Sequence, residues 1–549
     1  MTALAAAVPS SRSRRIGAAD LRRQLTINRE VALLDVREEH DYALGHILLA
    51  TLLPLSQLEL RIAVLVPRRS TPIVLCDGHN EELAERAARR LSELGYADLS
   101  ILAGGVAAWG DAGHPLFTTT HVLAKTFGGV AERAYQTPRI TAHELKTLID
   151  AGGDVVIFDA RTFAEFQAGS LPGAQSCPLA ELVDRVPDAV PSRHTLVVVN
   201  CASRTRGIVG AQSLVNLGLH NPVAVLENGV MAWSLAGGDV VKASGRVAPE
   251  PTPESFEDRR RAAQRLADRY GIPLIDRAGL RHLRDDHNRS LYLFDVRTPE
   301  AYEAGHWREA RSAPGGQLIM TLPQFIGTHR SRVVLIDAGE TLRAVTTAIW
   351  LKQIGRHDVY VLAELPPADE FVNGAAPPAA IGLPDGIEGI EPQAAATLLK
   401  SGRAAAIDVD TSLAYRDGHI PGAYFAIRSR LPAGLEKIAE GALILTSSDG
   451  QLAALAAADL AGLGRRVLAL RGGTAGWKAA GLQLEAGDGR GLHPFEDIWH
   501  SPMREVERRS EAYARYLAWE MSLADQVGHD GTVAFSFPGD FGRAKTASA

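Results

Sequence analysis

The chain has 549 residues, of which 46% are hydrophobic and 22% charged, and its formal net charge is −6. A single hydrophobic core stops growing near ~250–300 residues, so we expect about three or four domains. The composition is that of a soluble globular protein, and the charge gives no reason to expect nucleic acid or an anionic membrane as a partner. No apolar stretch approaches the ~18–20 residues that cross a bilayer.

The chain contains only three cysteines, widely spaced, which excludes a disulfide framework and a zinc-ligand pattern. We therefore expect a reducing compartment, the cytoplasm, and no metal site. In residues 1–15 the arginines follow the apolar part, which is the reverse of a secretory signal, so we interpret this segment as a leader without a fold.

A short apolar run that ends in an aspartate recurs along the chain. Three copies read Asp-x-Arg and the last is weaker: Leu33 to Arg37, Ile157 to Arg161, Leu293 to Arg297 and Ala406 to Asp410. The copies lie about 110 to 140 residues apart, a spacing that indicates duplicated domains and not a solenoid.

Each copy continues with a Gly-led turn, a second β-rich run and an alanine-rich helical stretch, and all but the third close on a Gly-rich turn followed by tryptophan. Strands that alternate with helices predict an α/β fold: a mostly parallel sheet with helices on both faces. In such sheets the ligand site lies beyond the carboxyl ends of the strands.

Cys201 lies at one of those strand ends. It follows the apolar run Leu196-Val197-Val198-Val199-Asn200 and precedes a predicted helix that begins near Gly207. Arg204 and Arg206 stand inside the intervening turn. A lone thiol between a strand and a helix, with two arginines beside it, predicts a site that holds a thiolate next to an anion.

Several motifs together resemble the rhodanese (sulfurtransferase) family. They are Asp-x-Arg on an early strand, the turn Gly418-His419-Ile420-Pro421-Gly422-Ala423, the strand–Cys loop–helix, and a terminal Gly-rich turn with tryptophan such as Gly104-Gly105-Val106-Ala107-Ala108-Trp109. The resemblance implies four tandem rhodanese-like domains and a helical C-terminal extension, with these boundaries: 15–117, 137–240, 273–366, 387–484 and 485–549.

The resemblance also implies a reaction. The nucleophilic Cys201 would take a sulfane sulfur from an anionic donor, become a persulfide, and pass the sulfur to cyanide or a thiol. From the residues themselves, the helix N-terminus and the arginines are expected to lower the thiol pKa. The donor would be bound by the rest of the loop: Ala202, Ser203, Arg204, Thr205 and Arg206. No cofactor is needed, and the partners would be a small-molecule donor and acceptor, with a protein sulfur acceptor also open.

Loop length separates this activity from its relatives. Four residues lie between Cys201 and Arg206, as in sulfurtransferases, whereas phosphatase loops carry five. The two arginines favour thiosulfate as the donor. Alternatives are a non-catalytic persulfide carrier, sensor or scaffold, and, less favoured, a phosphatase-like or arsenate-reducing enzyme.

The other copies lack a cysteine at the equivalent position. Alignment on the strand ends places Asp77, Asp337 and Ser447 there, so we expect domains 1, 3 and 4 to be catalytically silent. Cys76 stands one residue early and should point to the opposite face as a buried residue, unless the loop is slipped and Cys76 is active.

Four further features of the sequence carry expectations of their own. Asp159 and Arg161 are interpreted as a structural ion pair, since silent copies repeat them. Cys177 is expected to be a buried structural residue, with a redox partnership to Cys201 left open. Residues 118–136 form a helical linker that could cover the active site. The stretch from Arg504 to Leu523 is expected to be a docking helix.

Overall fold

The protein is described by a computed structural model that covers residues 13–501 and 508–538. Most of the predicted leader and the first residues of the predicted docking helix lie outside this range. The described chain forms two compact units, each built from separate stretches: residues 13–24, 31–120 and 378–499 in one, and 25–30, 121–377, 500–501 and 508–538 in the other. Domains 1 and 4 thus share one unit, and domains 2 and 3 share the other.

Domain 1 is a five-stranded parallel sheet with strand order β1-β5-β4-β2-β3 and helices on both faces. The central strand β4 is buried along its whole length, as a continuous apolar run in a parallel sheet should be. The elements are β1 (Arg14–Ile16), α1 (Ala18–Thr26), β2 (Ala32–Asp35), α2 (Glu39–Leu44), β3 (Thr51–Leu52), α3 (Leu58–Leu65), β4 (Ile73–Cys76), α4 (Glu82–Glu93), β5 (Leu99–Leu102) and α5 (Gly105–Asp111).

Domain 4, in the same unit, repeats this order and adds an edge strand, giving β18-β22-β21-β19-β20-β23. Its elements are β18 (Gly389–Ile390), α17 (Pro392–Lys400), β19 (Ala404–Asp408), α18 (Ser412–Asp417), β20 (Tyr424–Phe425), β21 (Ala442–Thr446), α19 (Gln451–Asp459), β22 (Val467–Leu470), α20 (Gly473–Ala479) and β23 (Arg490–Gly491).

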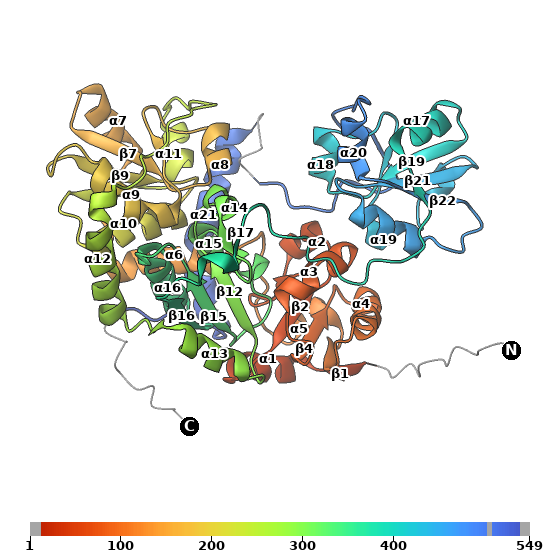
Figure 1. Cartoon of the computed structure of the whole chain (residues 1–549), viewed down its shortest axis with the longest axis horizontal. Coiled ribbons are helices and arrows are strands. Elements are labelled where there is room, and N and C mark those ends of the chain that lie inside the picture. Colours follow the sequence, from red (N-terminus) through yellow and green to blue (C-terminus); the bar gives the residue numbers. More distant parts are fainter. Residues whose placement is uncertain (1–12, 502–507, 539–549) are drawn as a thin grey trace. The chain divides into compact units, whose positions relative to one another are not determined.

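Domain 2 has the equivalent order β6-β10-β9-β7-β8, again parallel. Figure 1 shows its strands β7 and β9 with helices α7, α9, α10 and α11 around them. Its valine-rich strand β9 is central, so the residue that follows it emerges at the middle of the carboxyl edge. The elements are β6 (Arg139–Ile140), α7 (Ala142–Asp150), β7 (Val155–Asp159), α8 (Phe163–Ala168), β8 (Gln175–Ser176), α9 (Leu182–Ala189), β9 (Leu196–Asn200), α10 (Thr205–Leu217), β10 (Val223–Leu226) and α11 (Gly229–Leu235).

Domain 3 keeps the five-stranded order, β11-β16-β15-β12-β14, but ends differently. In place of the Gly-rich turn and tryptophan, β17 pairs antiparallel with β13. The elements are α12 (Phe256–Tyr270), β11 (Leu274–Ile275), α13 (Arg277–Asp285), β12 (Leu291–Asp295), α14 (Pro299–Ala304), β13 (His306–Trp307), β14 (Arg311–Ser312), α15 (Gly315–Met320), β15 (Arg332–Ile336), α16 (Leu342–Ile354), β16 (Asp358–Leu362) and β17 (Phe371–Val372).

Besides α12, two α-helices in the described part of the second unit lie outside the predicted domain bounds, and both pack on domain 2. Helix α6 (Val122–Tyr135), in the predicted linker, packs against α10, and α21 (Arg509–Asp530), in the predicted docking helix, packs against α6 and α11. In the described chain no helix is long and apolar enough to cross a membrane. The predicted fold class, four α/β domains with parallel sheets and a helical C-terminal end, is confirmed.

Candidate active site

Cys201 directly follows β9, and the loop it opens ends where α10 begins at Thr205. Its side chain is buried, with 3% of the residue exposed. The loop carbonyls are bonded by the first amides of α11: the Val230 N–H donates to the Cys201 carbonyl (2.8 Å) and the Met231 N–H to the Ala202 carbonyl (3.1 Å). The strand and two helix N-termini therefore fix the backbone of this loop.

The close approach of α11 explains why a glycine stands at its start. Gly229 has a φ of +56°, and a Cβ there would overlap the carbonyl of Cys201. Gly105 and Gly473 hold the same place in domains 1 and 4, where a Cβ would meet the carbonyls of Asp77 and Ser447. Only glycine permits both this backbone conformation and this contact.

The thiol does not have the lowered pKa that the sequence predicted. Burial raises the pKa of Cys201 above its ordinary value, although the Arg206 guanidinium and a hydrogen bond from the Gly207 amide lower it. The positive charges and the helix N-terminus lower the thiol pKa as predicted, but the desolvation of the buried sulfur raises it by more, and the sequence does not show this burial.

Both loop arginines are held by carboxylates. The Arg204 guanidinium contacts Glu132 of α6 at 2.5 Å. Arg206 makes a bidentate pair with Glu165 of α8, with both N–O distances 2.6 Å. Although burial raises the pKa of Glu165, Arg206 is the main group that lowers it, to about 2. Neither glutamate was singled out from the sequence, because each is remote from the loop along the chain.

Asp159 and Arg161 form a buried ion pair at the end of β7. The guanidinium lies 2.7 Å from the Asp159 carboxylate and also donates to the carbonyl of Gly169 at 2.6 Å. The same pair, with the same bond to the turn glycine, recurs in domains 1 and 3. The arginine thus ties the strand end to the Gly-led turn wherever it occurs.

In the other domains, the side chain at the cysteine position accepts hydrogen bonds from amides of its own loop and of the helix that follows. The Asp77 carboxylate accepts hydrogen bonds from three amides at the start of α4, at 3.1 to 3.2 Å. Asp337 accepts from the amides of Ala338 (2.7 Å) and Ala344 (3.2 Å), and the Ser447 hydroxyl from that of Ala453 (3.2 Å). In these three domains, amides equivalent to those beside the Cys201 sulfur therefore donate to a carboxylate or hydroxyl of the same loop.

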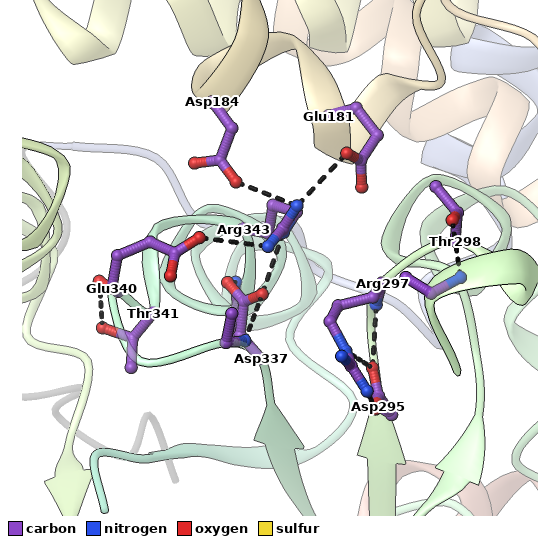
Figure 2. A network of polar contacts seen from close by, with 12 residues as sticks. Glu181, Asp184, Asp295, Arg297, Thr298, Asp337, Glu340, Thr341 and Arg343 are labelled. Atoms are coloured by element: carbon purple, nitrogen blue, oxygen red, sulfur yellow. Dashed lines mark hydrogen bonds and ion pairs between the residues drawn. The ribbon is translucent and has the colours of Figure 1, made fainter. Parts of the chain in front are cut away.

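The loop of domain 3 carries a second feature, the Arg343 cluster, formed by Arg343, Asp337, Glu340, Glu181 and Asp184. Figure 2 shows the guanidinium among four carboxylates, two from its own domain and two from domain 2, at 2.8 to 3.2 Å. All five residues are buried. The loop of domain 3 therefore anchors the segment at the start of α9 in domain 2.

A family model for the rhodanese-like domain matches residues 18–112, 141–236, 278–364 and 391–480. The chain belongs to the rhodanese family. A crystal structure of a thiosulfate sulfurtransferase from Pseudomonas aeruginosa is 41% identical, with a TM-score of 0.92, and the match covers 96% of this chain and 100% of that one. The prediction of a rhodanese-type enzyme is confirmed by this similarity.

A second relative shares only part of its length. An HTH-type transcriptional regulator from Mycobacterium tuberculosis is 36% identical over 100 residues, which are 18% of this chain and 42% of that protein. This match covers less than half of that protein.

The remaining cysteines of this rhodanese are buried free thiols. Cys76 lies at the end of β4 and Cys177 after β8, both with 0% exposure. Burial raises the pKa of both thiols well above the ordinary value. Asp77, and not Cys76, accepts the amides of its loop, so the structure gives no sign of the slipped loop.

Helices α6 and α21 bring residues that the sequence did not single out to the Cys201 loop. Gly128 of α6 lies against Thr205, where a Cβ would come within 2.6 Å of the hydroxyl. The Thr205 hydroxyl in turn contacts the Glu520 carboxylate of α21 at 3.5 Å. Lys125 of α6 contacts the hydroxyl of Tyr516. The prediction that the linker covers the site agrees with this packing.

Proposed function

We propose that this protein moves a sulfane sulfur from thiosulfate to a thiophilic acceptor through a persulfide on Cys201. The observation that carries the proposal is the contrast among four equivalent loop positions: one holds a thiol, and the others hold Asp77, Asp337 and Ser447. Only a thiolate combines strong nucleophilicity with the ability to leave again as the sulfur is passed on.

In the first step the Cys201 thiolate attacks the outer sulfur of thiosulfate. A bond forms between Sγ and that sulfur, the bond between the two thiosulfate sulfurs breaks, and its electron pair leaves with sulfite. In the second step cyanide carbon, or a thiolate, attacks the terminal persulfide sulfur. The electron pair of the Cys201 disulfide-type bond returns to Sγ, and thiocyanate or a new persulfide departs.

The loop supports this chemistry by orienting the sulfur and stabilising its charge. The amide of Gly207 and the N-terminus of α10 favour an anionic sulfur, and the nearby Arg206 adds positive potential. Burial opposes ionisation of the thiol, so we expect the first step to accelerate as pH rises toward the thiol pKa and to level off above it. Because all three cysteines are free thiols, we also propose a reducing compartment, the cytoplasm.

The test is intact-mass analysis after exposure to thiosulfate, mercaptopyruvate or glutathione persulfide in turn. Thiosulfate is expected to add the mass of one sulfur atom and to release one sulfite per adduct. Cys201→Ser should abolish the adduct, whereas Cys177→Ser, which removes another buried thiol, should keep it.

Three results would overturn the proposal in different ways. A sulfur adduct on the Cys201→Ser protein would show that another residue carries the sulfur. Slow turnover with cyanide but rapid transfer to a protein acceptor would indicate a persulfide carrier. Cys201-dependent release of phosphate from an aryl phosphate, without a sulfur adduct, would indicate the phosphatase-like alternative.

A further inference from the structure

The loop arginines of the candidate site are already neutralised. Arg204 is paired with Glu132 and Arg206 with Glu165. A thiosulfate dianion entering the site would therefore meet guanidinium groups whose charge is offset by carboxylates. A cation without such a partner would attract it more strongly.

Lys125 is such a cation. It lies on α6, outside the rhodanese domain, and is buried, with 8% of the residue exposed. Its ammonium contacts the Tyr516 hydroxyl and stacks over two rings of α21, 4.5 Å from the Tyr516 centroid and 5.1 Å from the Trp519 centroid. Among the described residues, no carboxylate oxygen lies within 4 Å of this ammonium.

A second donor without an acceptor lies beside it. The indole N–H of Trp519 is buried and has no hydrogen-bond partner among the described residues. A buried N–H without an acceptor is costly, and a ligand oxygen at this place would supply the missing bond. The ammonium comes from α6 and the indole N–H from α21, and the ammonium lies over the same Trp519 ring that carries this N–H.

These donors also adjoin the cysteine loop. Gly128, one turn after Lys125, packs directly on Thr205, and Glu520, one residue after Trp519, contacts the Thr205 hydroxyl. Thr205 of the cysteine loop thus packs against both α6, which carries Lys125, and α21, which carries Trp519.

We propose that Lys125, together with the Trp519 N–H, binds the anionic end of the sulfur donor, the sulfonate of thiosulfate. The inference rests on the proposed function and assigns donor recognition to two helices outside the catalytic domain. Lys125 then supplies a positive charge that, unlike those of Arg204 and Arg206, is not held in an ion pair, while the donor's outer sulfur faces Cys201.

The charge on Lys125 changes within the working pH range. Burial is the main cause that lowers its pKa, to about 8; Arg206 lowers it as well, and Glu520 and Cys201 raise it. The other titratable neighbours are His121, whose pKa burial lowers to about 3, and Tyr516, whose pKa burial raises well above its ordinary value. Both are therefore uncharged near pH 8. Donor affinity should weaken as pH rises through about 8, because Lys125 loses its proton.

The experiment measures thiosulfate affinity by calorimetry in the Cys201→Ser protein, where no turnover occurs and no thiol titrates at the site. Added to this background, Lys125→Met should weaken binding about tenfold or more, and Lys125→Arg should keep it within about threefold. Trp519→Phe should weaken it by a smaller factor. Lys146→Met, at an exposed lysine of α7 paired with Asp150, is the matched control and should have no effect.

A pH series gives a second, independent readout. Between about pH 6.5 and about pH 9.5 the dissociation constant should rise in the Cys201→Ser background and stay flat with Lys125→Arg, since a guanidinium keeps its proton. Equal affinity with Lys125→Met, or a flat profile in the background protein, would overturn the inference. If native protein gains sulfur on Cys201 but these constants do not change, only this inference fails; if no donor gives an adduct, the proposed function fails.

Discussion

Replacing Arg343 by methionine tests whether the loop of domain 3 stabilises domain 2 through charge. The substitution keeps a long apolar stem and removes a guanidinium that contacts four carboxylates at 2.8 to 3.2 Å. Removing one partner of a buried ion pair costs about 3–5 kcal/mol, because a buried charge is left uncompensated. We expect a loss of this size at about pH 8 in the free energy of unfolding of the unit that contains domains 2 and 3.

The loss should shrink at low pH. Burial raises the pKa of Asp184 well above its ordinary value, although the Arg343 guanidinium lowers it. Burial also raises the pKa of Glu340, again against the effect of the guanidinium. A carboxyl whose pKa is raised on folding contributes stability below its unfolded pKa and loses that contribution as pH rises through its folded pKa. Without Arg343 these carboxyls can still be protonated at about pH 5, so the variant should recover part of its stability there.

The assay is urea denaturation followed by tryptophan fluorescence, with the buried Trp350 of α16 as a probe in the same unit. With a denaturant slope of about 1–3 kcal/mol per molar, the midpoint should fall by about 1 M or more at about pH 8. Arg261→Met, at an exposed arginine paired with Asp258, is the control and should cost less than about 1 kcal/mol. A loss equal to the control, or the same loss at both pH values, would refute the electrostatic reasoning.

Three further predictions concern single residues. Burial raises the pKa of Asp408 to about 7, so the unit with domains 1 and 4 should lose stability as pH rises from about 4 to about 8. Asp408→Asn should remove that pH dependence. Identical urea midpoints at both pH values in the unsubstituted protein would contradict this prediction. Gly229→Ala should greatly reduce sulfur transfer and cost clearly more stability than Gly218→Ala, where φ is also positive but no atom lies within 4 Å of the new Cβ; equal costs in thermal melts would count against the close approach. Glu165→Gln should free Arg206 to act on the active thiol, so the pH midpoint of iodoacetamide alkylation should move down, and an unchanged midpoint would reject it.

The fold was largely predictable because it depends on local pattern repeated in sequence. The buried strands are continuous apolar runs such as Ile73–Cys76, and the Asp-x-Arg pairs close within three residues, as Asp159 and Arg161 do. The position of Cys201 after β9 follows from the same local pattern. The sequence shows that the third copy lacks the Gly-rich turn and tryptophan at its end. No sequence pattern predicts what stands there instead, the antiparallel pairing of β17 with β13.

The surroundings of the thiol were not predictable to the same degree. Arg204 meets Glu132 and Thr205 meets Glu520 across 72 and 315 residues of sequence. Such contacts depend on where α6 and α21 pack, which no local motif encodes. The same packing covers Cys201, which is why its pKa is raised where the motif alone predicted that it would be lowered.

Local pattern in the sequence was enough to predict a tandem array of four rhodanese-like domains with a thiol at one of four equivalent loop positions, because strand period, turn chemistry and motif spacing are local properties. The packing of distant segments was needed to show which domains share a unit, which carboxylates neutralise the loop arginines, and that α6, the helix of Lys125, packs on the cysteine loop. Those outcomes depend on desolvation and on charges that meet only when distant segments pack together, and both are set by burial.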